Sequence, residues 1–86
     1  MTTVNTTVTT AWTKLADDTD LEFLLTWDIP VDAEFATTAT DTAPTVRGHR
    51  LSREMALSRG VLGDGFVWAK LVAGSIPSNV AMVVTK

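Results

Sequence analysis

Hydrophobic side chains concentrate in two stretches near the C-terminal end of the sequence, and these stretches suggest the fold. Phe66–Val72 and Val80–Thr85 are rich in β-branched and aromatic residues, which favour strands. Gly74–Asn79 between them has the composition of a turn, so we predict two antiparallel strands joined by a loop. The turn signal Gly63-Asp64-Gly65 indicates that a third strand leads into this pair. Both faces of Phe66–Val72 are largely apolar, which predicts a strand that is central or covered on both sides.

Such a sheet needs a second apolar layer, and three segments of the N-terminal half can supply it. Thr2–Thr13 is rich in threonine, a good strand residue, and its large apolar side chains all stand at even positions. Leu21–Asp28 alternates between apolar and polar residues, as in a half-buried strand. Ala33–Thr40 is a further strand candidate whose small residues suit a sheet edge or a closely packed neighbour. The side chains expected to share an apolar face are Val4, Val8 and Trp12 in the first segment, and Leu21, Phe23, Leu25 and Trp27 in the second.

The segment 52–59 has two interpretations. Ser52 could cap a short helix over Arg53–Arg59, since this stretch contains good helix formers. Alternatively, Met55–Arg59 is a strand with Met55 and Leu57 facing inward. We favour the strand, because the segment is short and its surroundings all have strand patterns.

Taken together, the pattern predicts an all-β protein: a small antiparallel β-sandwich, jelly-roll or Greek-key like, with about six to eight short strands. We divide the chain into a threonine-rich arm, 1–10, and a single sandwich domain, 11–86. The arm is expected to be mobile or to exchange strands with a neighbour. The chain has 86 residues and no cysteine, so no disulfide or thiolate metal site supports this small core. Small domains without such supports often oligomerise.

Charge is distributed unevenly along the sequence. Residues 1–46 contain eight acidic residues and one lysine, whereas residues 47–86 contain six basic and two acidic residues. This asymmetry favours pairing of the acidic half of one copy with the basic half of another copy or of another protein. The alternative is a set of solvated charges with no partner.

The residues that could carry chemistry are few. His49 is the only histidine, and without cysteine it could recruit only carboxylates as metal ligands, which suits zinc poorly. No nucleophile motif or phosphate-binding loop is found, so we expect no enzymatic activity, no cofactor and no metal ion. The acidic net charge of −3 and the lack of a long apolar run lead us to expect neither nucleic acid nor membrane as a partner. The basic cluster instead suits a protein interface, and the predicted interface residues are Val4, Val8, Arg47, His49, Arg50, Arg53 and Arg59.

Several short motifs resemble small virion proteins of tailed bacteriophages, of the capsid decoration (cement) or head-fibre type. The similarity covers about residues 11–86 and consists of short elements that mark turns and core positions. The motifs that carry it are Ala11-Trp12-Thr13-Lys14-Leu15-Ala16, Trp27-Asp28-Ile29-Pro30, Ala43-Pro44-Thr45, Gly48-His49-Arg50-Leu51 and Gly65-Phe66-Val67-Trp68-Ala69-Lys70.

The resemblance implies a non-enzymatic structural protein that decorates or cements the outer surface of a capsid. Its partners would be the major capsid protein or another virion protein, and it would form a homo-oligomer, with a trimer favoured. The alternative is an attachment or carbohydrate-binding sandwich of a tail or fibre protein, in which Trp12, Trp27 or Trp68 would stack on sugars. Tryptophans on strand faces of so small a domain more often belong to the core.

Overall fold

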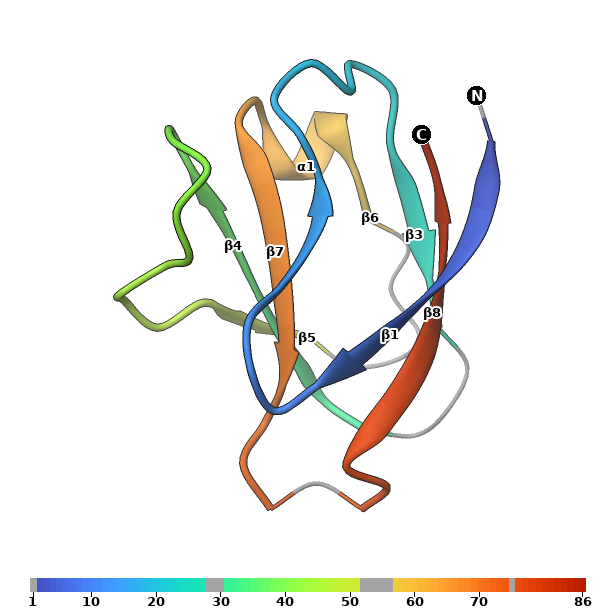
Figure 1. The fold of residues 1–86 in the computed structure, drawn as a ribbon, viewed down its shortest axis with the longest axis vertical. Coiled ribbons are helices and arrows are strands. Elements are labelled where there is room, and N and C mark those ends of the chain that lie inside the picture. The colour runs from blue at the N-terminus through green and yellow to red at the C-terminus, as the bar shows by residue number, and fades with distance from the viewer. Residues whose placement is uncertain (1, 28–30, 52–56, 75) are drawn as a thin grey trace.

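The computed structural model describes residues 2–27, 31–51, 57–74 and 76–86. These residues form two packed antiparallel sheets and one short helix (Figure 1). The prediction of a small all-β sandwich is confirmed. The elements are β1 (Thr3–Thr9), β2 (Thr13–Ala16), β3 (Leu24–Thr26), β4 (Ala33–Thr38), β5 (His49–Leu51), β6 (Leu57–Ser58), α1 (Arg59–Leu62), β7 (Phe66–Leu71) and β8 (Asn79–Thr85).

The connectivity is that of a jelly roll. One sheet, called sheet A here, has the strand order β1-β8-β3-β6, and the other, sheet B, has the order β2-β7-β4-β5. The pairs β1·β8, β2·β7, β3·β6 and β4·β5 are nested within one another, as in one long antiparallel ribbon. Rolling this ribbon also pairs β8 with β3 and β7 with β4, which completes the two sheets.

The predicted C-terminal hairpin is wrong. Phe66–Val72 and Val80–Thr85 are consecutive, but β7 lies in sheet B and β8 lies in sheet A. Each strand pairs instead with segments far away in the sequence, so the connection after β7 crosses from one sheet to the other. The segment before the Gly63-Asp64-Gly65 turn is α1, not the expected strand. The central position of β7 is confirmed, since it lies between β2 and β4.

The core between the sheets follows from alternation in the strands. Val67, Ala69 and Leu71 of β7 are fully buried, as are the alternate residues of β8. Phe23, Leu25 and Trp27 are buried as predicted, whereas Leu21 is 77% exposed. The remaining large buried side chains of the core are Val8, Leu15, Val31, Phe35, Leu57, Val80, Met82 and Val84.

The threonine-rich segment forms part of sheet A. β1 pairs with β8 over its whole length, from Thr3 opposite Thr85 to Thr9 opposite Asn79, without a bulge. Residues 3–9 therefore belong to the sandwich, although the sequence analysis set residues 1–10 apart as an arm. Strand exchange by this segment stays a prediction.

Residues 52–56 lie outside the described residues, and so does the start of the helix that Ser52 would cap. Leu57 is a fully buried strand residue of β6, in agreement with the favoured interpretation. The helical turn that the structure contains begins later, at Arg59.

Candidate interaction surfaces

The predicted interface residues do not form one surface, and Arg59 has a structural position. Its guanidinium donates four hydrogen bonds to backbone carbonyls, with distances of 2.6 Å to Asp17 O, 2.8 Å to Asp20 O, 2.7 Å to Gly65 O and 3.2 Å to Gly63 O. It also lies 6.0 Å from the centre of the Phe23 ring. The Arg59 side chain is half-buried and joins the loop before β3 to the turn before β7. Four of its five N–H donors are therefore occupied within the chain.

Arg50 also has an intrachain partner. It lies on the outer side of sheet B, where its Nε and Nη2 atoms are 3.1 Å and 3.0 Å from Asp32 Oδ2. Arg53 lies outside the described residues. The basic cluster predicted from the sequence is thus divided between different parts of the molecule.

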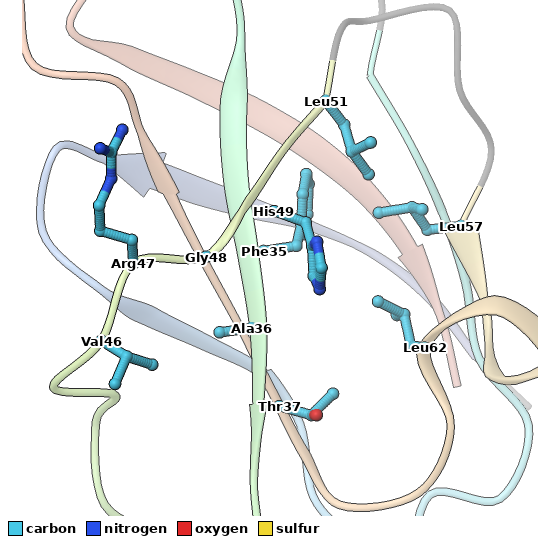
Figure 2. Close-up of a pocket in the computed structure, with 10 residues that line it drawn as sticks. All are labelled: Phe35, Ala36, Thr37, Val46, Arg47, Gly48, His49, Leu51, Leu57 and Leu62. Carbon is cyan, nitrogen blue, oxygen red and sulfur yellow. The ribbon is translucent and has the colours of Figure 1, made fainter.

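Arg47 and His49 line a pocket of about 450 Å³ at the side of the sandwich where β5 and β6 end the two sheets. The apolar lining includes Phe35, Leu51 and Leu57. Figure 2 shows the imidazole of His49 directed into this space and the guanidinium of Arg47 directed away from it. The pocket could therefore give a ligand apolar contacts and one imidazole as a polar contact.

No described residues form a group of three or more His, Cys, Asp or Glu side chains that could hold a metal ion. Among the helices in the described part of the chain, none is long and apolar enough to span a membrane.

The three tryptophans have different environments. Trp27 is 4% exposed and its Nε1 donates a 3.1 Å hydrogen bond to Val31 O, while its ring lies 5.4 Å from that of Phe35. Trp68 is 9% exposed and donates to Thr38 Oγ1 at 2.9 Å. The side chains of Trp27 and Trp68 are therefore buried, with little surface available to a ligand. Trp12 does not share the core face with Val8 as predicted, because the chain crosses to sheet B between β1 and β2.

Trp12 lies close to Gly48 and to Lys70 of sheet B. A Cβ atom at Gly48 would stand 2.9 Å from Trp12 Cη2 and 2.6 Å from Phe35 O, so the close approach requires glycine. Lys70 Nζ lies 4.7 Å from the centre of the Trp12 ring, in the position of a cation–π contact. The half-buried Trp12 ring thus contacts residues of its own chain.

The outer face of sheet B carries charges that are paired with each other. Lys14 Nζ lies 2.8 Å from Asp17 and 2.9 Å from Asp41, and Lys70 Nζ lies 3.7 Å from Glu34. Hydrogen bonding from Lys14 holds the pKa of Asp17 below its ordinary value. Asp32–Arg50 and Glu34–Lys70 join the acidic and basic halves of one chain, so part of the predicted charge asymmetry is compensated internally.

The outer face of sheet A has the opposite character, because no outward residue of its described strands is charged. Register and alternation place Thr3 beside Thr85, with 2.7 Å between their hydroxyl oxygens, and Val83 beside Asn5. Val83 is 41% exposed and Leu24 is 47% exposed. The outward residues of the sheet are Thr3, Asn5, Thr7 and Thr9 of β1, Asn79, Ala81, Val83 and Thr85 of β8, Leu24 and Thr26 of β3, and Ser58 of β6. We call this set the uncharged face.

The two valines predicted at the interface have different positions in β1. Val8 is fully buried in the core. Val4 has the same parity but is 41% exposed, because it lies at the end of the sandwich where the inner face of β1 is less covered. Sequence reasoning placed the interface on four arginines, His49 and these two valines, and it missed the uncharged face. The signal was present in β1 and β8, whose sequences contain no charged residue at any position.

Comparison of this chain with protein-family models, with curated proteins and with solved structures gives no significant match.

Proposed function

We propose that this protein is a non-enzymatic structural protein of a bacteriophage virion that attaches to the outer capsid surface through the uncharged face of sheet A. The major capsid protein or another virion protein would be the partner. The observation that carries the proposal is the difference between the two outer faces, with ion pairs on sheet B and uncharged, partly apolar side chains on sheet A.

This difference suits adhesion through one face. The centres of protein interfaces are depleted of charged residues, because each buried charge must be desolvated or paired. Exposed Leu24 and Val83 would contribute apolar area, and threonine and asparagine side chains would supply hydrogen bonds without a charge penalty. The jelly-roll architecture is compatible with this role, since capsid and lectin domains use it, although architecture alone does not determine function.

The physical effect would follow from mass action. A protein that binds the assembled shell but not its separated subunits stabilises the shell. Repetition of the same contact over many sites adds avidity without requiring a strong single contact. A modest uncharged face is sufficient for such a role.

The test compares purified virions with particles that lack this protein, by electron microscopy. We expect additional density on the outer surface of the complete particles. Purified protein is then added back to the deficient particles as wild type, as Val83→Lys and as Thr42→Lys. Val83→Lys places a charge on the uncharged face and should raise the dissociation constant about tenfold or more, equivalent to about 1.4 kcal/mol per site. Thr42→Lys changes an exposed loop outside that face and should bind as wild type does. Absence of the protein from purified virions would refute the proposal, as would equal binding by Val83→Lys.

A further inference from the structure

β1 is an unusually unprotected sheet edge. Natural edge strands avoid pairing with other chains by being short, by carrying charged residues or by containing bulges. Among the described strands at sheet ends, β6 has two residues, β5 has three, and β2 contains both Lys14 and a register shift. β1 has seven residues, no charge, no proline and no shift in its pairing with β8.

The backbone of β1 shows which groups point to the open edge. Thr2 and Lys86 exchange two backbone hydrogen bonds, of 2.9 Å and 3.2 Å, so they are a hydrogen-bonded pair of the antiparallel ladder. Such pairs alternate with non-hydrogen-bonded pairs, and the even residues of β1 are therefore the ones that bond to β8. The N–H and C=O groups of Thr3, Asn5, Thr7 and Thr9 point to the opposite side, where none of the described strands neighbours β1.

The sequence of this edge is nearly the same in both directions. Residues 2–10 are Thr-Thr-Val-Asn-Thr-Thr-Val-Thr-Thr, and reversal about Thr6 exchanges only Asn5 with Thr7. In an antiparallel pair of two such strands centred on Thr6, valine lies opposite valine and threonine opposite threonine. The odd residues, which present their backbone groups to the open edge, lie opposite odd residues. The register that places like side chains opposite each other therefore also places the free N–H and C=O groups of the two edges opposite each other.

We propose that two copies of this chain associate by antiparallel pairing of their β1 edges about a two-fold axis at Thr6. The two four-stranded sheets A would then form one continuous sheet. Val4, which is 41% exposed in a single copy, would lie opposite Val8 of the second copy and lose its contact with water. No pair of like charges would face each other, because β1 carries no charge.

This contact closes on itself. Each copy has one β1 edge, and the two-fold pairing uses both edges, so the product is a dimer and not an open fibre. The inference therefore differs from the trimer favoured by the sequence analysis. It does not depend on capsid attachment, although a continuous sheet would place the uncharged faces of both copies side by side.

The first test uses two valines of equal exposure. Val4→Lys places an ammonium opposite the partner's β1 edge, whereas Val83→Lys places it on the outer face of β8, away from that edge; both wild-type valines are 41% exposed. Sedimentation velocity over a range of concentrations should show a monomer–dimer equilibrium for the wild type and for Val83→Lys. The dissociation constant of Val4→Lys should rise about tenfold or more. Circular dichroism and thermal unfolding establish that both variants are folded.

The second test removes a hydrogen-bond donor from the open edge. Thr7→Pro eliminates an N–H group that points away from β8, so the pairing within one chain is retained while the pairing between copies loses donors. Thr7→Val keeps the donor and is the matched control. Only Thr7→Pro should weaken the dimer.

Hydrogen exchange gives a readout at single residues. The amides of Thr3, Asn5, Thr7 and Thr9 should become protected as protein concentration rises, whereas the even amides of β1 should be protected at every concentration. A wild-type protein that stays monomeric up to millimolar concentration would overturn the inference. A dissociation constant that neither Val4→Lys nor Thr7→Pro raises would also overturn it. The same holds if the exchange rates of the odd-numbered β1 amides do not depend on protein concentration. Loss of capsid binding in Val83→Lys with dimerisation intact would separate this inference from the proposed function.

Discussion

At the scale of single residues, Arg59 shows how a charged side chain can organise several loops. Its planar guanidinium has donors in fixed directions, which suits four carbonyl oxygens from two parts of the chain, the loop before β3 and the turn before β7. A lysine ammonium has one nitrogen and cannot reach this set. The sequence showed Arg59 only as one of four arginines, because the carbonyls that accept its hydrogen bonds are distant in sequence.

Replacing Arg59 should therefore destabilise the fold. Arg59→Ala is expected to lower the free energy of unfolding by about 2–4 kcal/mol, since each lost hydrogen bond contributes about 0.5–1.5 kcal/mol. Arg59→Lys should recover only a small part of this loss. Exposed Arg47 is the control, and Arg47→Ala should change stability by less than about 0.5 kcal/mol. Urea unfolding measures all three variants, and equal stability of Arg59→Ala and Arg47→Ala would contradict this assignment.

The ion pair of Lys14 predicts a dependence of stability on pH. The hydrogen bond from Lys14 lowers the pKa of Asp17 from 3.8, and hydrogen bonds to Asp17 and Asp41 raise the pKa of Lys14 from 10.5. A lowered carboxyl pKa stabilises the fold above 3.8, and this contribution is lost as pH falls through the folded-state value. A raised ammonium pKa stabilises the fold below 10.5, and this contribution is lost as pH rises through the folded-state value.

Thermal unfolding of wild type and Lys14→Met can test this. The wild type should have the higher midpoint at neutral pH, and the difference should shrink as pH falls below 3.8. About 1 M salt should also reduce the difference at neutral pH, because these groups are partly exposed and screening then acts within about 3 Å. A difference that stays constant down to about pH 2 would show that Lys14 acts through packing, for example on the Phe66 ring 5.6 Å away.

At the scale of elements, the sequence predicts many of the side chains that face inward but not which strands pair. Alternation identified Phe23, Leu25 and Trp27 as core residues, because a period of two is a local property. The pairing of β7 with β4 and of β8 with β1 depends on contacts between distant segments. The loop after β7 has the composition of a hairpin turn, and that local signal gave the wrong partner. Turn chemistry shows that a strand ends but not which sheet the next strand joins.

The candidate surfaces were also only partly predictable from the sequence, because they too depend on which strands are neighbours. The absence of charge in β1 and β8 is visible in the sequence, but its meaning requires the knowledge that these strands are neighbours. Arg50 and Arg59 appeared to be available for partners because their acceptors, Asp32 and the backbone carbonyls, are remote in sequence. Charge clusters read from a sequence are therefore weak evidence for an interface until intrachain pairs are known.

At the scale of the whole molecule, the nested pairing brings the two ends of the chain together. Thr2 and Lys86 are joined by backbone hydrogen bonds, and Figure 1 shows the N and C ends beside each other. The rolled ribbon has its local turn between β4 and β5, at residues 39–48, and its open end between β1 and β8. In the wild type β4·β5 is the innermost pair in sequence and β1·β8 is the outermost. If the termini were joined and the β4–β5 connection opened, β8·β1 would become the innermost pair and β5·β4 the outermost, and every strand would keep its partners.

This reversal predicts that a circular permutant retains the fold. A linker of about two to four residues between Lys86 and Thr2 would convert β8 and β1 into a hairpin, and new termini between Thr42 and Ala43 would lie in an exposed loop. The permutant should show the same far-UV circular dichroism and cooperative unfolding as wild type. Its refolding rate should stay within about tenfold of the wild-type rate, because the average sequence separation of the paired strands is preserved when the nesting is reversed. A linker of about ten residues is the control, since the hydrogen-bonded ends should make the additional length unnecessary. A permutant that folds only with the long linker would show that β1 and β8 do not meet at their ends, and that the ribbon is not closed in the way the strand registers require.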